Sequence, residues 1–592
     1  VCQALVDFGA SLTLRDNQGR SALDYACIYR HDAIVRILAT HERADPSDAD
    51  ETGLTALHWA HGKTAVDILV DAGADIHTQD NRGRRPLHYL YSKSNITICA
   101  LLNRGANINA VDAQLQTPLH LATKEKDDPG IVMFMIQRGA NIGARNIRGK
   151  TPLHMAAQRG RVAVTRILMA TGQDPNFQSD RGMSAITFAA ANGHLCTVNA
   201  ILSRGRNVLV NATDELGQTP LHYTSRKKYI AVTVKLLRAG ADPNIRSNNG
   251  RSPIDIAVME RRQKTLELMI QHGADVTDTD GIGQTPLHIA AKYGNAEAAE
   301  TLIHAGADPV ARNSQDLSPL DIATTRGKLN VVLTLLRHNE KVDANAADQQ
   351  GWTALHYAAR AGNVAITGEL MDAGADCGIR NSTQASPFDH AVGYGQDSTA
   401  KLMIQRGADA RAVDDTGFTA LHLAETVSMI DMLVEEGAVM EAKNDEGNTA
   451  FMYQSVDTQL VRAHIRHGAK VNTRNEQGKT ILHMVSTSCR GRTMVTIVDD
   501  LLKAGADETI RDNHGHTPLH YYSADGSPAA AEAAKLLRDA PADRAWRRRG
   551  HLLMCMQLQN LFTPSTEDRL FMSLSGMRKT TEGIFRNIVS YL

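Results

Sequence analysis

Histidine is the residue type that most suggests chemistry in this sequence. Ten of the 24 histidines end a tetrapeptide of the form Thr/Ser-x-apolar-x, and such a series could serve acid–base catalysis or metal binding. Because the ten recur at a fixed spacing, we interpret them as one structural position repeated along the chain. They are His58, His88, His120, His154, His222, His288, His356, His422, His483 and His520.

A metal site is the first chemical alternative to consider. His514, His516 and His520 lie close together in sequence, but zinc normally requires a more closed set of ligands and no cysteine lies near them. The seven cysteines are far apart, odd in number and never form a CxxC pair, which argues against a thiolate site and a disulfide framework. We therefore predict no metal and a reducing compartment, the cytoplasm or the nucleus.

Three segments imitate nucleotide-binding loops. Residues 148–151 and 477–480 read RGKT and QGKT, yet the glycine required five places upstream is Ala144 in one and Thr473 in the other. Residues 280–285, DGIGQT, are half a dinucleotide fingerprint that runs directly into a helix start. No Ser/His/Asp or Cys/His group stands apart from the repeated positions. The sequence therefore predicts no catalytic residue, no cofactor and no enzyme activity.

Composition narrows the classes of partner. The 64 basic and 65 acidic residues nearly cancel, so the global charge that draws a protein to nucleic acid is missing. The longest apolar runs, IVMFMI from residue 131 and LLMCM from residue 552, are far shorter than the roughly 18 residues of a membrane span. We expect a monomer with no membrane span that binds other proteins and no nucleic acid. Because the chain opens on Val1 inside a half repeat, we also expect a fragment.

The tetrapeptide marks an internal repeat. The mean period is near 33 residues, and a fixed period of this length indicates stacked supersecondary structures instead of separate globular domains. About sixteen repeats then fill residues 1–541, the first of them partial, and residues 542–592 form a separate C-terminal segment. The copies begin at Ser21, Thr55, Arg85, Thr117, Thr151, Ser184, Thr219, Ser252, Thr285, Ser318, Thr353, Ser386, Thr419, Thr449, Thr480 and Thr517.

One repeat, residues 283–309, shows how the local pattern is interpreted. Thr285 is a helix N-cap, Gly294 ends this short helix, and Asn295 caps a second helix. Each helix has one apolar stripe that the pair cannot bury alone, so neighbouring repeats must stack. The linking Asp-x-x-Gly segments, such as residues 80–83, are turns that project as hairpin tips.

These features resemble the ankyrin repeat. TPLH begins at residues 117, 151, 219, 285 and 517, AAxxG follows in several repeats, and G-A-D or G-A-N recurs along the chain. The resemblance covers roughly residues 1–540. It implies an all-α solenoid of paired antiparallel short helices with projecting β-hairpin-like loops. Such a solenoid binds proteins along a concave surface of hairpin tips and first helices, usually without catalysis.

Two forms of the tetrapeptide alternate through the middle of the chain, one ending in histidine and one not. In three repeats of the second form, Asp255, Asp321 and Asp389 lie at the third helical position. A carboxylate there is stabilised by the helix dipole. It can also accept a hydrogen bond from the backbone N–H of the capping serine, whose side chain accepts one from the N–H of the aspartate. Two of these repeats have Asp316 and Gln384 in place of the turn glycine, so we expect their tips to differ in shape.

Positions that vary between repeats are the candidates for partner binding. Early repeats carry a strip of basic residues around the turns, and Arg85, Arg181 and residues 226–228 belong to it together with the basic candidates given below. Later repeats carry aromatic residues at such positions, and aromatic residues are typical binding anchors. Two interpretations stay open. Either the arginines are only solvated and the rings pack on a neighbouring tip, or an acidic partner segment lies across the strip with an apolar anchor further along. The candidate partner-binding residues are Arg82, Arg84, Arg148, Lys150, Arg159, Tyr293, Trp352 and Phe418.

Residues 542–592 break the period. Their composition favours two or three amphipathic helices that cap the last repeat, because the end of a stacked array needs covering. The spacing of the apolar residues near the end also resembles the first helix of an F-box, although the Leu-Pro opening is absent and the chain stops where the rest should begin. These residues are Ile584, Ile588, Val589, Tyr591 and Leu592. Two functions follow. One is a non-enzymatic interaction scaffold, and the other is a substrate-recruiting adaptor that docks onto a ubiquitin ligase through this tail.

Repeat length also predicts a weak point. The repeats that begin at Thr419 and Thr449 are shortened, and the one that follows is stretched. Because the stability of stacked repeats is a sum of local interfaces, we expect hydrogen exchange to be fastest between about residues 419 and 516.

Overall fold

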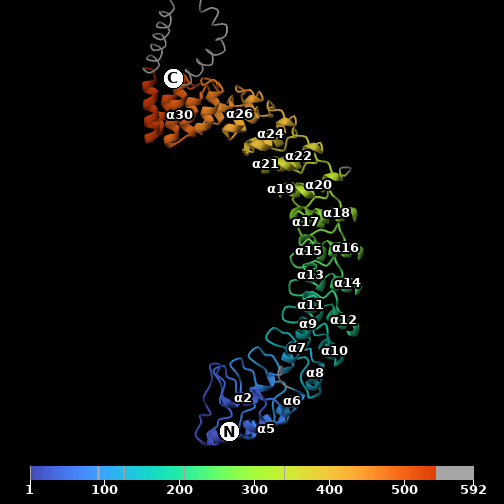
Figure 1. Ribbon diagram of the computed structural model, residues 1–592. Coiled ribbons are helices and arrows are strands. Elements are labelled where there is room, and N and C mark those ends of the chain that lie inside the picture. Colours follow the sequence, from blue (N-terminus) through green and yellow to red (C-terminus); the bar gives the residue numbers. More distant parts are fainter. Residues whose placement is uncertain (1, 90–93, 126, 206, 339–340, 542–592) are drawn as a thin grey trace, which may run out of the picture. The chain divides into compact units, whose positions relative to one another are not determined.

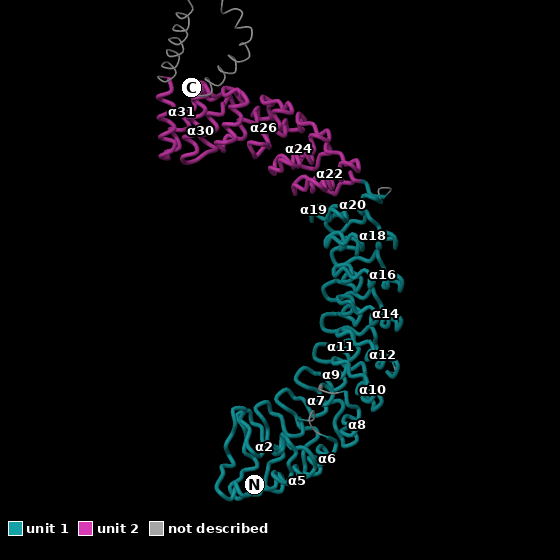
Figure 2. The backbone as a smooth tube through the Cα atoms, in the orientation of Figure 1, with its two compact units in different colours: residues 1–343 teal, residues 344–592 magenta. Residues whose placement is uncertain are grey.

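The chain folds as successive pairs of short helices, one pair for each repeat (Figure 1). The computed structural model describes residues 2–89, 94–125, 127–205, 207–338 and 341–541. Two compact units, residues 1–343 and residues 344–592, divide the chain (Figure 2). The predicted C-terminal cap or docking segment, residues 542–592, lies outside the described residues.

In the first unit, the helices form two rows, and helices of the same row contact their neighbours (Figure 1). The first row begins each repeat just after its cap. It contains α2 (Ala22–Ile28), α4 (Ala56–Trp59), η1 (Pro86–His88), α7 (Pro118–Glu125), α9 (Pro152–Arg159), α11 (Ala185–Ala191), α13 (Pro220–Ser225), α15 (Pro253–Met259), α17 (Pro286–Tyr293) and α19 (Pro319–Thr325). The second row contains α1 (Cys2–Asp7), α3 (Asp32–Ala39), α5 (Lys63–Asp71), α6 (Asn95–Asn103), α8 (Pro129–Gln137), α10 (Val162–Ala170), α12 (Leu195–Arg204), α14 (Ile230–Arg238), α16 (Gln263–Gln271), α18 (Ala296–His304) and α20 (Leu329–Arg337).

The second unit repeats this arrangement. Its first row contains α21 (Ala354–Ala361), α23 (Pro387–Gly393), α25 (Ala420–Leu423), α27 (Ala450–Tyr453), α29 (Ile481–Ser488) and α31 (Pro518–Asp525). Its second row contains α22 (Val364–Asp372), α24 (Asp397–Gln405), α26 (Val427–Glu435), α28 (Thr458–Arg466) and α30 (Gly491–Lys503), and residues 528–541 are also helical. The predicted all-α fold of paired short helices is confirmed.

The helix pair α17 and α18 shows why the repeats stack. Leu287 of α17 and Leu302 of α18 are completely buried, together with the alanines on the same faces. Gly294 has a φ of 70° and ends α17, as predicted. The side chain of Asn295 accepts a hydrogen bond from the N–H of Ala298 and donates one to the carbonyl of Val258 in the preceding repeat. One residue therefore caps its own helix and also binds the neighbouring repeat.

The predicted hairpin turns precede the first-row helices, and we call each of them a finger. In the finger at residues 80–83, the carboxylate of Asp80 accepts hydrogen bonds from the N–H groups of Arg82 and Arg84. Gly83 has a φ of 69°, and a Cβ atom there would lie 2.8 Å from the N atom of Ala113 in the next finger. Glycine is therefore required for two reasons, its positive φ and the close approach of the next finger.

The fingers without glycine correct one expectation. Asp316 and Gln384 have φ angles of 60° and 63°, in the same left-handed region as the turn glycines. Their N–H groups donate to the carbonyls of Asn313 and Asn381, three residues earlier, just as the glycines do. The predicted difference in tip shape is wrong, because the backbone turn is the same and only the side chain differs.

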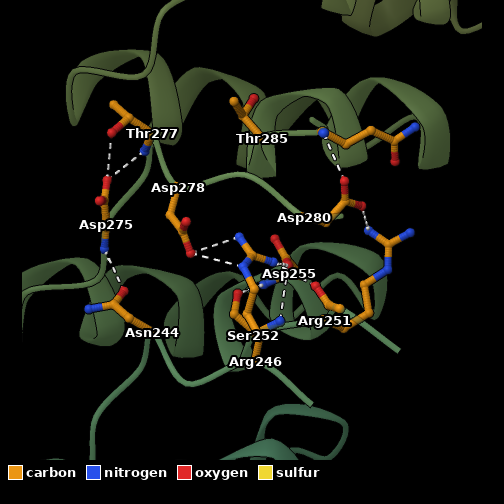
Figure 3. Close-up of polar contacts among 12 residues, drawn as sticks. Asn244, Arg246, Arg251, Ser252, Asp255, Asp275, Thr277, Asp278, Asp280 and Thr285 are labelled. Carbon is orange, nitrogen blue, oxygen red and sulfur yellow. Dashed lines mark hydrogen bonds and ion pairs between the residues drawn. The ribbon is translucent and has the colours of Figure 1, made fainter. Parts of the chain in front are cut away.

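An asparagine at the end of several repeats joins consecutive repeats. Asn244 is an example: its side chain donates to the carbonyl of Gly273, 3.1 Å away. It also accepts from the N–H of Asp275, 2.8 Å away (Figure 3). Two hydrogen bonds to the backbone of the next repeat fix the spacing of the stack. The same pair of bonds is made by Asn109, Asn176, Asn211, Asn345 and Asn472.

The shortened repeats have correspondingly short helices. α25 and α27 contain four residues each, whereas α30 in the stretched repeat contains 13. The predicted fast hydrogen exchange between about residues 419 and 516 stays a prediction.

Candidate partner-binding site

The recurrent histidines are held by the same hydrogen bonds in successive repeats. In His222, Nδ1 accepts from the N–H of Thr219, 3.0 Å away, so Nε2 carries the proton and donates to the carbonyl of Arg251, also 3.0 Å away. The first bond caps the histidine's own helix, and the second joins it to the next repeat. The same two types of bond are made by His58, His88, His120, His154, His288, His356, His422 and His483.

Burial lowers the pKa of eight of these rings and so favours their neutral form: His88, His120, His154, His222, His288, His356, His422 and His483. It lowers the pKa of His154, His222 and His356 to about 4, against the hydrogen bonds to the carbonyls of neighbouring residues, which favour the protonated ring. A neutral ring with both nitrogens occupied has no free lone pair for a metal ion or a transferred proton. These nine histidines are therefore structural, whereas the tenth, His520, is exposed.

The aspartate form of the repeat uses an ion pair instead (Figure 3). The carboxylate of Asp255 accepts from the N–H of Ser252 at 3.0 Å and lies 2.9 Å from a guanidinium nitrogen of Arg246. Arg246 also reaches Asp278 in the next repeat, at 2.8 Å. Burial raises the pKa of Asp255, and the hydrogen bond from Ser252 and the charge of Arg246 oppose this rise. An arginine nine residues before the aspartate recurs in the pairs Arg15–Asp24, Arg312–Asp321 and Arg380–Asp389.

A tyrosine fixes several fingers to the first-row helix that follows. The hydroxyl of Tyr223 donates to the carboxylate of Asp214 at 2.5 Å, and burial together with this bond raises the pKa of Tyr223. The finger and the first helix therefore form one rigid surface, which we call the finger face. The same bond is made by Tyr25, Tyr89, Tyr357 and Tyr521 to Asp16, Asp80, Asp348 and Asp512.

The predicted basic residues divide into two groups. Arg82, Arg148 and Arg159 are exposed on the finger face. Arg84 is mostly buried and lies 3.5 Å from the carboxylate of Asp112. Lys150 is half-buried, donates to the side chain of Gln158 and lies over the ring of Phe188, 4.5 Å from its centroid. The structure thus leaves the first three free to meet a partner and gives the other two roles inside the fold.

The predicted aromatic residues lie in rows of packed rings. Trp352 is half-buried, with its ring centroid 5.1 Å from that of Tyr357 and 4.4 Å from that of His390 in the next repeat. Phe418 is also half-buried, and its centroid lies 5.1 Å from that of Tyr453.

Tyr293, at the end of α17, is 38% exposed. All three aromatic residues lie on the finger face, so their part in binding stays a prediction.

Two features were missed from the sequence. The first is the arginine nine residues before the aspartate at the third helical position, as in Arg246 and Asp255. Both residues are visible in the sequence, but only the packed structure shows that they form an ion pair. Leu115 occupies a finger position that glycine holds in most repeats, with a φ of 54° and 48% of its surface exposed. A bulky apolar residue at positive φ is the signal that could have found it.

The described part of the chain has no arrangement typical of a metal site or a membrane span. Within it, no group of three or more His, Cys, Asp or Glu side chains is arranged to hold a metal ion. The rings of His516 and His520 stack on each other with centroids 3.9 Å apart. None of the described helices combines the length and the apolar character that a membrane crossing requires.

Comparison with known proteins identifies the repeats. Overlapping segments that together cover residues 1–381 match the family model of ankyrin repeats, with three copies per match. Among solved structures, the ankyrin repeat domain of Bcl-3, a member of the IkappaB protein family, is 28% identical. That alignment covers 37% of this chain and 98% of that domain, with a TM-score of 0.35.

Relatives share short stretches with this chain. It is 37% identical over 107 residues to the transient receptor potential cation channel subfamily A member 1 homolog of Caenorhabditis elegans, covering 18% of this chain and 9% of that protein. It is 33% identical over 129 residues to Rabankyrin-5 of Mus musculus, covering 21% and 11%. It is 34% identical over 117 residues to E3 ubiquitin-protein ligase KEG of Arabidopsis thaliana, covering 18% and 7%. The chain therefore matches only a small part of each relative's length.

Proposed function

This chain belongs to the ankyrin-repeat family, and we propose that it is a non-enzymatic scaffold that binds partner proteins through its finger face. One observation carries the proposal, the difference between shared and variable positions. Polar side chains at shared positions, such as those of His222 and Asp255, already cap a helix, bind the next repeat or form an ion pair. Variable positions such as Arg148 and Arg159 are exposed. Residues that do not serve the fold are the ones available for choosing a partner.

We propose further that the partner presents an acidic segment to the early repeats. Arg82, Arg148 and Arg159 are exposed cations on one face. The nearby carboxylates Asp112 and Asp180 are paired with other arginines. The positive charge of the strip is therefore not neutralised by these two carboxylates, and an acidic segment complements it.

An apolar anchor on the finger face of the second unit supports the same function. Trp352 and Phe418 belong to rows of rings whose exposed members include Tyr394 and Tyr453, 48% and 50% exposed. Large, rigid aromatic surfaces bind partners at a small cost in conformational entropy. The half-buried rings hold the exposed ones in place.

Affinity capture with matched variants tests the proposal. Arg148→Glu with Arg159→Glu reverses two charges on the finger face, and Arg166→Glu reverses an exposed charge on the second-row helix α10 of the same repeat. We expect the first variant to lose partners that the wild-type chain and the Arg166 variant both retain. If both variants capture the same proteins as wild type, the basic strip does not bind a partner.

Two further variants test the anchor and the tail. A chain with Trp352→Ala and Phe418→Ala is expected to lose partners that bind the second unit, with its helical content checked by circular dichroism because both rings pack on neighbours. A chain that ends near residue 545 separates a scaffold from an adaptor. Loss of ubiquitin-ligase subunits alone, with other partners retained, would favour the adaptor.

A further inference from the structure

Leu115 is an unfavourable residue for its place in the fold. Its φ of 54° lies in the left-handed region, which disfavours a branched apolar side chain, and the N–H of Leu115 donates to the carbonyl of Asp112 as a turn glycine would. Nearly half of its surface, 48%, is exposed to solvent. Leucine is strained at this backbone position and leaves an exposed apolar surface that glycine would not, which indicates a role in binding.

The neighbouring finger extends this apolar surface. Ile147 is 61% exposed, and its N–H donates to the carbonyl of Gln114, next to Leu115, at 2.9 Å. The two apolar side chains therefore project from adjacent fingers whose backbones are bonded to each other. Exposed apolar side chains that lie together, unlike single ones, mark an interaction surface.

Arginines surround this pair: Arg82 lies on the preceding finger, Arg148 next to Ile147 on its own finger, and Arg181 on the following one. The carbonyl of Arg82 accepts from the N–H of Ala113, and the carbonyl of Arg148 accepts from the N–H of Asp180. The same backbone bonds therefore run across four consecutive fingers, and the last of these carries the exposed Arg181. The positions of the arginines relative to Leu115 are thus fixed by the backbone.

Positive charge is concentrated on this surface. Burial lowers the pKa of Lys150, and the charges of Arg148 and Arg181 lower it further, so three cations act on the same region. The carboxylate of Asp180 is bound to Arg145 at 2.6 Å. An incoming acidic group would meet positive charge on both sides of the apolar pair.

We propose that Leu115 and Ile147, with Arg82, Arg148 and Arg181 around them, form a docking site for an extended partner segment that alternates acidic and apolar residues. This inference rests on the proposed binding function and names its ligand class. A phosphate backbone would also meet the arginines but leaves Leu115 and Ile147 without apolar contacts, so the surface favours a peptide over a nucleic acid.

The repeat spacing sets the spacing of the partner's side chains. Stacked helices lie about 8–10 Å apart and an extended chain advances about 3.3 Å per residue, so one finger corresponds to about three residues of the partner. We therefore expect an acidic residue opposite Arg82 and an apolar residue about three positions along, opposite Leu115. An apolar and an acidic residue should follow about six positions along, opposite Ile147 and Arg148, and an acidic residue about nine positions along, opposite Arg181.

Selection from a phage-displayed library of random 16-residue peptides on the full chain tests this site. The enriched peptides are expected to carry acidic and apolar residues in the spacing above. Synthetic copies are then titrated against the wild-type chain, Leu115→Gly, Ile147→Ser and the control Arg166→Glu. Because the partner would bury the leucine side chain, we expect Leu115→Gly to bind the peptides about tenfold or more weakly than wild type. Arg166→Glu should bind the peptides as wild type does.

Thermal unfolding of the same variants separates docking from folding. Leu115→Gly should keep or raise the unfolding midpoint, because glycine adopts positive φ freely. The docking site is refuted if the enriched peptides bind Leu115→Gly and Ile147→Ser as tightly as wild type, or if Leu115→Gly loses stability along with affinity. Binding of a single-stranded oligonucleotide that competes with the peptides and ignores both substitutions would also overturn it. Recovery of no enriched peptide would overturn the proposed binding function as well, whereas enriched peptides that depend on other finger-face residues would overturn only this site.

Discussion

The buried histidines make the stability of each repeat depend on pH, and His222 gives a measurable case. Its pKa is lowered from 6.5 to about 4 by burial. As the pH falls below 6.5, the unfolded chain binds a proton at this residue and the folded chain does not, so stability is lost between pH 6.5 and about pH 4 and not further below. At pH 5 the loss amounts to about 2 kcal/mol relative to pH 7, from the two pKa values.

Replacing His222 by Asn isolates this contribution. The Asn side chain can still accept from the N–H of Thr219 but does not titrate, and it is too short to reach the carbonyl of Arg251. The variant should therefore be less stable at pH 7, by about 1–3 kcal/mol for the unpaired carbonyl. It should also lose about 2 kcal/mol less than wild type when the pH is lowered from 7 to 5.

Native-state hydrogen exchange, corrected for the intrinsic effect of pH on exchange, measures these local stabilities. The amides of α14 (Ile230–Arg238) report on the repeat that contains His222, and those of α10 (Val162–Ala170), two repeats away, serve as an internal control. Equal pH dependence of α14 in the wild type and in His222→Asn would refute the reasoning. It would show that this histidine is not the group that the unfolded chain protonates.

Three further perturbations follow from the same structure. Arg246→Met leaves the fully buried carboxylate of Asp255 without its ion pair, and we expect a loss of about 3 kcal/mol in urea unfolding, which a negligible change would contradict. Gly417→Ala brings a Cβ atom to 2.7 Å from the Cα of Asn444 at a φ of 77°, so a loss of about 2 kcal/mol is expected, and a fully stable variant would show that this finger can move aside. Hydrogen exchange should be fastest between about residues 419 and 516, and uniform protection of both compact units would rule this out.

Local chemistry explains how much of the fold was predictable. The cap at Thr285, the end of α17 at Gly294 and the second cap at Asn295 depend on residues within a few positions of one another, and the structure has each of them as predicted. The shape of the finger at Asp316 was predicted wrongly. Glycine is the usual residue at positive φ, but the hydrogen bonds of a turn can also hold another residue there.

The candidate site was less predictable, because exposure depends on neighbouring repeats. Arg84 and Arg148 belong to the same basic strip in the sequence, yet Asp112 of the next repeat binds the first and the second stays exposed. Trp352 occupies a variable position that suggested an exposed anchor, but the ring of His390 in the next repeat half-buries it. Whether a side chain faces solvent is decided by a residue about 30 positions away.

The sequence by itself therefore determined the repeat, its caps and its turns, because each is made by hydrogen bonds and dihedral preferences that act within a few residues. Only the tertiary structure decided which shared side chains bind across the repeat interface and which variable ones remain free. The bond from His222 to the carbonyl of Arg251 forms only when two repeats are stacked, and the exposed fraction of Leu115 is likewise set by the stacking. The physical reason is that stacking brings together groups whose separation in sequence gives no indication of their distance in space.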